Sequence, residues 1–234
     1  MARTFELRPF PQQIDAELLA RLAKVEPATI GHYKHDGFLD PDIRAVVPGK
    51  RIAGTAVTVA IPGADSTLLH HALGYVRPGD VVVVARAGDR RHACWGGSLT
   101  VAGKAKGIAG VVIDGAATDF GEIRAHELPL WCRGPSPITT RLYAHGGAMN
   151  VPVAVGGVVV RPGDAVLADE NGIVVLDPGE VTHWCDVALA EQEEEVPFND
   201  DLKKGARLGT LSGATDMIAR AAGIEIDPET GLPR

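Results

Sequence analysis

Residues 107–119 read Gly-Ile-Ala-Gly-Val-Val-Ile-Asp-Gly-Ala-Ala-Thr-Asp, and this stretch decides the fold class. Gly107 ends a helical pattern that begins at Leu99. The short apolar run 109–113 that follows is typical of a strand buried inside a sheet. A second helical pattern then covers 120–127. Helix, buried strand and helix in succession indicate an α/β protein.

The same alternation continues in both directions along the chain. Strands are expected at 51–61, 81–85, 130–133, 151–160, 165–168 and 172–176. Helices are expected at 12–26, from Pro27 toward His32, and at 66–75, 181–195, 200–205 and 215–222. The pentapeptide Val-Arg-Pro-Gly-Asp precedes a strand at 76–80 and again at 160–164, so both halves of the chain are expected to enter a sheet through the same turn.

No Pro/Ser-rich linker interrupts these elements, and the sequence therefore predicts a single domain over 1–234. Its core is expected at about 48–178. A helical N-terminal arm would cover 10–47, and a C-terminal helical extension would cover 179–234.

Composition narrows the function classes. A net charge of -7 argues against a nucleic-acid surface, which needs clustered Lys and Arg. No apolar run approaches the roughly 20 residues that span a bilayer. Charged residues at positions 3, 6 and 8 are unlike a signal peptide, and the three cysteines form no CxxC pair. We therefore expect a cytoplasmic protein that binds neither nucleic acid nor membrane.

A glycine loop before the helix at 99–106 is the first candidate site. Gly96 and Gly97 would let backbone amides approach a ligand closely. Ser98 is a good helix N-cap, and the free amides at a helix start bind carboxylates or phosphates. The alternative is an ordinary loop with a glycine turn and a capping serine.

Asp119, just after the strand at 109–113, is the second candidate. Open α/β sheets bind ligands beyond the carboxyl ends of their strands. A single exposed carboxylate is also a common anchor for Mg²⁺, with waters and substrate oxygens as the other ligands. The alternative is an N-cap for the helix at 120–127, in a capping box with Glu122.

These motifs resemble a known family. They comprise Gly-Gly-x-Leu at 96–99, then a helix, Lys-Gly-Ile-Ala-Gly-Val-Val-Ile-Asp-Gly at 106–115 and Asp119, together with matching segments at 54–59, 78–80, 150–153, 162–164 and 168–175. Over roughly 15–215 the chain is similar to the 4-hydroxy-4-methyl-2-oxoglutarate / 4-carboxy-4-hydroxy-2-oxoadipate aldolases. That family includes regulator of ribonuclease activity A, and its members are often mislabelled demethylmenaquinone methyltransferases.

The resemblance implies a swivelling-type α/β/β/α domain, assembled as a homotrimer or a dimer of trimers with sites between subunits. It implies a divalent cation, Mg²⁺ or Mn²⁺, on Asp119. It also places pyruvyl binding on Gly96, Gly97, Ser98 and Leu99, and a substrate-binding position at Thr118. A Glu from a neighbouring subunit's C-terminal arm would fall near Glu195.

The sequence departs from the family at two of these positions. The aldolases carry Asp or Glu, which orders and deprotonates a water, where this chain has Gly97. They carry a substrate-binding Arg where this chain has Thr118, which offers no positive fork to a carboxylate. Arg90, Arg91 and His92, a few residues upstream, could return positive charge to the pocket; the alternative is that they are solvated loop residues.

Other residues carry weaker signals. Cys94 suggests a thiol nucleophile, although no base pairs with it clearly. In the adjacent pair His70-His71, one side chain is expected in the core and one at the surface. Arg141 flanks an apparent loop, and the sequence assigns it no role.

The leading hypothesis is metal-dependent carbon–carbon cleavage of a small 2-oxo acid. Retro-aldol cleavage would leave a pyruvate enolate, stabilised by the metal and by the amides of 96–99. His92 or a water on the metal would accept the hydroxyl proton, with Arg91 and Glu195 as further catalytic candidates. Oxaloacetate decarboxylation passes through the same enolate. The alternatives are a non-catalytic regulator of the ribonuclease type and an enzyme of the same fold with a different substrate.

Overall fold

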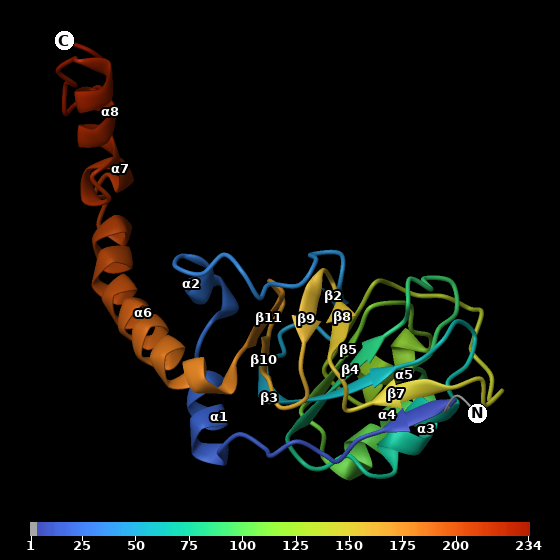
Figure 1. The fold of residues 1–234 in the computed structure, drawn as a ribbon. Helices are drawn as coiled ribbons and strands as arrows, with labels where there is room; N and C mark the ends of the chain where they lie inside the picture. The colour runs from blue at the N-terminus through green and yellow to red at the C-terminus, as the bar shows by residue number, and fades with distance from the viewer. Residues whose placement is uncertain (1–3) are drawn as a thin grey trace. The chain divides into compact units, whose positions relative to one another are not determined.

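The computed structural model describes residues 4–234 (Figure 1). The chain divides into two compact units, of which the first ends at Ala188 and the second is Leu189–Arg234. The first unit contains all the strands. Its architecture of a mixed sheet covered by helices confirms the α/β prediction.

The sheet has the strand order β1-β7-β3-β4-β5-β6-β2, and β10 pairs with both β3 and β11. Its strands are β1 (Phe5–Leu7), β2 (Arg44–Ala45), β3 (Ile52–Ala60), β4 (Asp80–Ala85), β5 (Gly110–Ile113), β6 (Leu130–Cys132), β7 (Gly147–Met149), β10 (Ala165–Ala168) and β11 (Ile173–Leu176). The central strands β3, β4, β5 and β6 run parallel. Their carboxyl ends therefore meet at one edge of the sheet.

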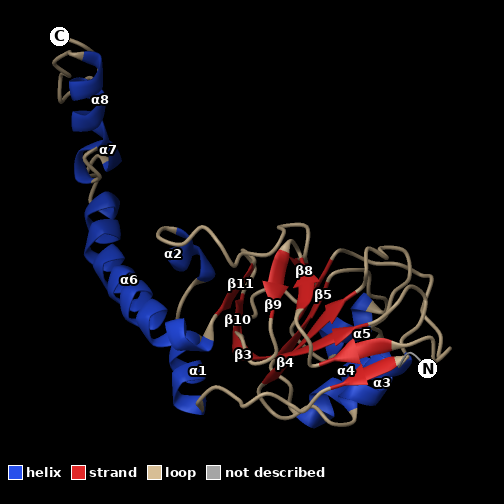
Figure 2. Cartoon of the chain, viewed as in Figure 1, coloured by secondary structure: helices blue, strands red, loops and turns tan. Residues whose placement is uncertain are grey.

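Helices connect the parallel strands. They are α3 (Thr67–Leu73), α4 (Gly97–Lys106) and α5 (Phe120–Ala125), and α4 packs between the other two (Figure 2). Val82 and Val84 of β4 belong to the core cluster beneath these helices, whereas Val81 and Val83 belong to the cluster on the opposite face. Alternation of side chains along a strand buried on both faces explains why these segments are continuously apolar.

A β-hairpin contributes to the opposite core cluster. It consists of β8 (Val153–Val155) and β9 (Val158–Val160), which pair antiparallel. The expectation of one strand over 151–160 is therefore wrong. Gly156 and Gly157 have φ of 55° and 80°, the positive values that a two-residue hairpin turn requires.

The N-terminal helices are α1 (Ala16–Leu22) and α2 (Pro27–Gly31). Asp15 caps α1 by accepting the amides of Glu17 and Leu18, so this helix starts later than the predicted residue 12.

The C-terminal helices are α6 (Val181–Lys203), α7 (Leu208–Leu211) and α8 (Ala214–Ala222), preceded by the 3-10 turn Pro178–Glu180. The two helices expected at 181–195 and 200–205 form one helix, which contains Pro197. No residue of Leu189–Arg234 is buried, although α8 has a strongly apolar face. Across residues 4–234, no helix is long and apolar enough to cross a membrane.

Candidate functional site

The loops that follow β4, β5 and β6 meet at the carboxyl edge of the sheet. The Thr118 amide, after β5, donates to the carbonyl of Trp95, after β4 (2.8 Å). The Ala93 amide donates to the carbonyl of Ile138, after β6 (2.7 Å). Backbone hydrogen bonds of this kind fix the three loops relative to one another.

A cavity of about 320 Å³ lies among these loops. Residues 93–99, 118–119 and 139–142 line it, with Ser66 and His70 from the start of α3. We call it the Asp119 cavity. Its volume lies at the lower end of the range of small-molecule sites. Asp119 and Arg141 are the only permanently charged side chains among its lining residues.

The Asp119 carboxylate faces this cavity and does not cap a helix. Its oxygens accept the Gly97 amide (2.9 Å) and the Thr118 hydroxyl (3.2 Å). The residue has φ of 53°, in the left-handed region that is rare outside glycine, and its side chain caps no amide of α5. Asp119 thus stands at the N-cap position of α5 and its carbonyl accepts the Ile123 amide (3.0 Å), but the side-chain cap that the alternative predicted is not formed.

The surroundings of Asp119 fit a hard divalent cation. The carboxylate is exposed, and among residues 4–234 no Lys, Arg or His forms an ion pair with it. Two hydrogen bonds orient its oxygens, and lone pairs remain available because each carboxylate oxygen has two. One oriented carboxylate with open space in front of it is a common magnesium anchor.

The helix beside Asp119 begins earlier than predicted. The Thr100 amide bonds to the Gly96 carbonyl (3.0 Å), so Gly96 is the N-cap and α4 begins at Gly97. Ser98 therefore lies in the first turn, and its predicted N-cap role is wrong. Within the described chain, no carbonyl accepts the amides of Ser98 and Leu99, which remain free for an anion at the helix start.

Position 96 needs glycine because its backbone lies close to Asp119, the candidate metal ligand. A Cβ at Gly96 would lie 2.6 Å from the Asp119 Oδ2 atom and 2.9 Å from the Thr118 methyl group. Beneath the loop, the buried indole of Trp95 donates to the Thr100 hydroxyl (3.0 Å), which donates to the Gly96 carbonyl (2.9 Å). These two hydrogen bonds fix the glycine loop to the buried side of α4.

Gly97 faces a different neighbour. A Cβ at this position would overlap the Glu122 carboxylate on α5. Glu122 therefore occupies the space that an acidic side chain at 97 would enter. The sequence indicated Glu122 only as a capping partner, and its approach to Gly97 depends on how α4 and α5 pack.

This approach predicts the outcome of restoring an acid at position 97. Gly97→Asp alone is expected to displace the exposed Glu122 side chain, whose carboxylate end is the overlapping group, and to destabilise the protein by at most about 1 kcal/mol through repulsion between two carboxylates. Gly97→Asp with Glu122→Ala should recover most of that loss. Urea unfolding of wild type, both single variants and the double variant measures the coupling; strictly additive effects would contradict the predicted overlap.

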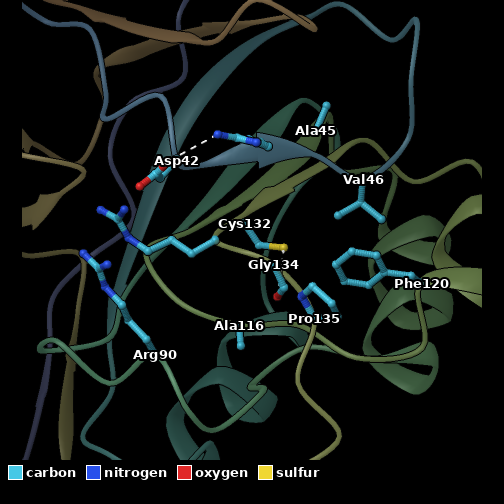
Figure 3. A pocket seen from close by; sticks show the side chains of 11 residues that line it. Asp42, Ala45, Val46, Arg90, Ala116, Phe120, Cys132, Gly134 and Pro135 are labelled. Carbon is cyan, nitrogen blue, oxygen red and sulfur yellow. Dashed lines mark hydrogen bonds and ion pairs between the residues drawn. The ribbon is translucent and has the colours of Figure 1, made fainter.

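The Arg90–His92 segment lies outside the lining of the Asp119 cavity. Arg90 instead lines a second cavity of about 510 Å³, whose lining also includes Phe120, Cys132 and Gly134 (Figure 3). The ring Nδ1 of His92 lies 2.8 Å from Asp89 Oδ2. Hydrogen bonds from the amides of Arg91 and His92 to Asp89 make a local turn of this segment. Any catalytic part for these residues stays a prediction.

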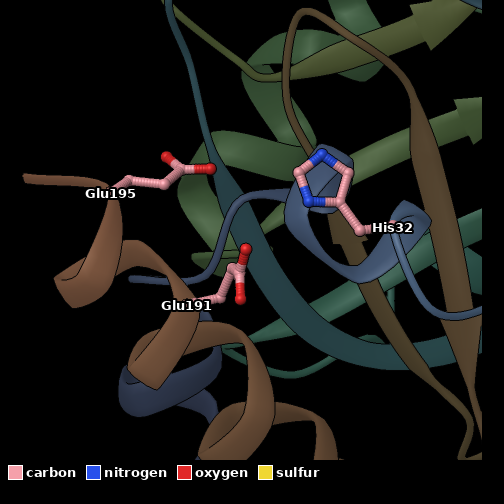
Figure 4. Close-up of side chains that lie close together, drawn as sticks. All are labelled: His32, Glu191 and Glu195. Atoms are coloured by element: carbon pink, nitrogen blue, oxygen red, sulfur yellow. The ribbon is translucent and has the colours of Figure 1, made fainter. Parts of the chain in front are cut away.

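Two other predicted groups are placed as follows. Cys94 is fully buried, and burial raises the pKa of its thiol to about 12, which disfavours the thiolate that a nucleophile needs. Glu195 lies in the C-terminal unit, where it and Glu191 project from α6 one helical turn apart (Figure 4). Its part in a site stays a prediction.

Arg141 is a lining residue that sequence reasoning left unassigned. Its amide donates to the Ala64 carbonyl (2.8 Å), and its carbonyl accepts the Ser66 amide (2.9 Å). The loop therefore runs beside the segment that leads into α3. No local motif announces this pairing of residues far apart in sequence.

Asp65 holds the same loop from inside. Its buried carboxylate accepts the Thr67 hydroxyl (2.6 Å) and the amides of Tyr143 (3.1 Å) and His145 (2.7 Å). Burial alone raises the pKa of Asp65, but the hydrogen bonds outweigh burial and hold the pKa well below its usual value. Asp65 therefore remains an anion that orders the loop carrying Arg141.

Comparison with known proteins identifies a match over most of this architecture. The family model described as RraA-like, aldolase/RraA, matches residues 16–175. A protein of Halalkalibacterium halodurans named "Putative 4-hydroxy-4-methyl-2-oxoglutarate aldolase" is 31% identical over 157 residues, which cover 67% of this chain and 74% of that relative.

Solved structures show the same fold. Streptomyces coelicolor RraAS2, described as an unusual member of the RNase ES inhibitor RraA protein family, has a TM-score of 0.70 and 32% identity, covering 80% of this chain and 98% of that one. An uncharacterized Pseudomonas syringae protein has a TM-score of 0.73 and 27% identity, covering 88% of this chain and 98% of that one.

Proposed function

Because this chain belongs to the RraA-like family of aldolases and RraA proteins, we propose that it is a divalent-metal-dependent lyase that cleaves a carbon–carbon bond of a small 2-oxo acid. The observation that carries the proposal is the Asp119 cavity. It places an oriented carboxylate beside the free amides of Ser98 and Leu99. A 2-oxo acid has a keto oxygen, which a bound cation can polarise, and a carboxylate, which the free amides of a helix start can bind.

Asp119 is the residue that would hold Mg²⁺ or Mn²⁺. When bound, the ion would supply Lewis-acid polarisation of the substrate's keto and carboxylate oxygens. The amides of Ser98 and Leu99 would orient the carboxylate next to the keto group and would stabilise negative charge that develops there. Gly96 keeps this approach open, because any side chain would displace the Asp119 carboxylate.

The proposed reaction is retro-aldol cleavage of a 4-hydroxy-2-oxo diacid. The C4 hydroxyl loses its proton, and its oxygen forms a carbonyl as the bond between C3 and C4 breaks. The C4 fragment leaves as a carbonyl product, and the electron pair of the broken bond becomes that of a pyruvate enolate. The enolate then takes a proton at C3 and leaves as pyruvate. Decarboxylation of oxaloacetate gives the same enolate, so it is proposed as a second reaction of this site. Besides Asp119, which would hold the metal, His70 is the one lining side chain with an imidazole that could take the hydroxyl proton.

Pyruvate release tests this proposal. Purified protein with Mg²⁺ or Mn²⁺ is expected to release pyruvate from 4-hydroxy-4-methyl-2-oxoglutarate or from oxaloacetate, and chelation of the metal should stop the release. A folded protein that releases no pyruvate from either compound would support the alternative function, a non-catalytic regulator. Streptomyces coelicolor RraAS2 is described as a member of such a ribonuclease inhibitor family. Inhibition of a ribonuclease would then be the positive result.

We also propose a cytoplasmic homotrimer or hexamer built on a swivelling α/β/β/α core, with the N-terminal arm and C-terminal extension as helical additions. The support for assembly comes from the C-terminal unit. Leu189–Arg234 contains no buried residue, and Met217 and Ile218 on α8 are 68% and 58% exposed. A helix face of this kind gains stability when another copy of the chain covers it.

Disrupting that face is expected to weaken the assembly. Met217→Asp with Ile218→Asp should lower the mass measured by light scattering at micromolar concentration, because each burial of such a side chain contributes about 1.5–3 kcal/mol. Arg220→Asp on the same helix is the matched control and should leave the mass unchanged. A mass that is the same for all three proteins would exclude α8 from the interface.

A further inference from the structure

We propose that Arg141 binds the second carboxylate of a 2-oxo diacid, and so makes the site selective for diacids over monoacids. The inference rests on the proposed function, because it assumes that the first carboxylate binds at Asp119 and the Ser98–Leu99 amides. Thr118 cannot supply a positive charge. In this inference Arg141, which belongs to another loop, supplies it.

The charge distribution of the Asp119 cavity is the first argument. Thr118 stands in the lining without charge, and Arg90 and Arg91 are not part of it. Arg141 is the only guanidinium among the lining residues. A diacid whose 2-oxo end binds beside Asp119 therefore meets one cation within the same cavity.

The hydrogen bonds of Arg141 are the second argument. Its Nη1 donates to the Thr139 carbonyl (3.2 Å), the Thr139 hydroxyl (2.6 Å) and the Thr140 carbonyl (3.0 Å). All three acceptors are neutral. Across residues 4–234, Arg141 forms no ion pair, and Nε and Nη2 donate no hydrogen bond. The guanidinium is thus oriented by one nitrogen while its other donors and its full charge remain available.

The backbone beneath Arg141 is the third argument. The Arg141 amide and carbonyl are bonded to Ala64 and Ser66. The Asp65 carboxylate accepts the amides of Tyr143 and His145, which lie two and four residues further along the same loop. A fixed guanidinium loses less conformational freedom on binding than a free surface arginine does. Arg141 is itself exposed, and the ordered backbone beneath it limits the conformational freedom that its side chain would lose on binding.

The ligand chemistry follows from the fork of donors. A carboxylate accepts two parallel N–H bonds from an arginine, a geometry that lysine cannot reproduce. The free Nε and Nη2 provide such a pair. Arg141 lines the cavity from the loop after β6, whereas Thr118 lines it from the loop after β5. The second carboxylate of a bound diacid would therefore lie toward residues 139–142.

Ligand binding in the presence of Mn²⁺ tests the inference without turnover. The probes are 2-oxoglutarate, a diacid that lacks the 4-hydroxyl and is not a retro-aldol substrate, and the monoacid 2-oxobutyrate. Arg141→Gln is expected to weaken 2-oxoglutarate binding about 10- to 100-fold by calorimetry, since a hydrogen bond to a charged group has that worth. Binding of 2-oxobutyrate should stay within about twofold. Arg141→Lys should fall between wild type and Arg141→Gln.

Arg161→Gln is the matched control, because it removes the same charge from an exposed residue outside the cavity. The inference is overturned if Arg141→Gln and Arg141→Lys bind 2-oxoglutarate as wild type does, or if both lose diacid and monoacid equally. It is also overturned if wild type binds neither probe.

The results that would overturn the lyase assignment differ from those that would overturn the role of Arg141. A wild-type protein whose diacid binding depends on Arg141, but which releases no pyruvate from any 4-hydroxy-2-oxo diacid or from oxaloacetate, keeps the binding site and loses the lyase assignment. Pyruvate release that is equally efficient in wild type and Arg141→Gln keeps the lyase assignment and excludes Arg141 as the diacid cation.

Discussion

Asp119→Asn is expected to abolish Mn²⁺ binding at micromolar metal and to lower pyruvate release by about a thousandfold or more, since a bound cation is worth several kcal/mol of transition-state stabilisation. Asparagine can still accept the Gly97 amide through its one side-chain oxygen, and its amide nitrogen can donate to the Thr118 hydroxyl. What it removes is the negative charge that a hard cation needs. Electron paramagnetic resonance of bound Mn²⁺ and a coupled pyruvate assay measure the two effects.

The matched control is Asp216→Asn, which removes one exposed carboxylate from α8, outside the Asp119 cavity. It should bind Mn²⁺ and release pyruvate as wild type does. Wild-type Mn²⁺ affinity in Asp119→Asn would show that another group anchors the metal. Loss of activity with unchanged metal binding would make Asp119 a group that acts on the substrate and not a ligand.

Trp95→Ala is expected to lower the free energy of unfolding by about 3–5 kcal/mol, the usual range for deleting a buried aromatic side chain. Trp95 is fully buried beneath the glycine loop, and its ring lies 3.5 Å from where a Cβ would stand at Gly103 of α4. Urea denaturation measures the change, provided that a single transition is observed.

Trp95→Phe separates packing from hydrogen bonding. It retains most of the apolar ring but loses the indole N–H that bonds the Thr100 hydroxyl. We expect it to lose about 1–2 kcal/mol, nearer the value of one buried hydrogen bond plus a small cavity. Equal destabilisation by the two variants would mean that the hydrogen bond, and not ring packing, supports the loop.

The position of Asp119 was predictable because short-range signals agree there. A buried strand, a turn and a helix follow one another within about twenty residues, and parallel strands of an α/β sheet end at a common edge. The glycine loop at 96–99 has a similar local signature. These signals do not depend on distant contacts, so the sequence alone indicated the place of the site.

The arginine that lines the Asp119 cavity was not predictable in this way. Arg90, Arg91 and His92 are close to Gly96 in sequence, but Asp89 turns their segment away from the cavity lining. Arg141 is far from Asp119 in sequence and reaches the cavity because its loop pairs with Ala64 and Ser66. Hydrogen bonds between single residues far apart in the sequence leave no periodic pattern that could predict them.

Short strands escaped prediction for a related reason. β1, β2 and β7 contain two or three residues each, and β1 pairs with β7 about 140 residues away. Such elements have too few residues for an alternation to be visible. The double glycine at 156–157 was visible, but the valines on both sides of it led to the prediction of one strand over 151–160.

A crystal structure with Mn²⁺ and oxalate, a stable mimic of pyruvate enolate, tests the central claim most directly. The account predicts manganese on a carboxylate oxygen of Asp119, with oxalate between the metal and the amides of Ser98 and Leu99. Manganese bound elsewhere, or oxalate that makes no contact with the start of α4, would contradict it.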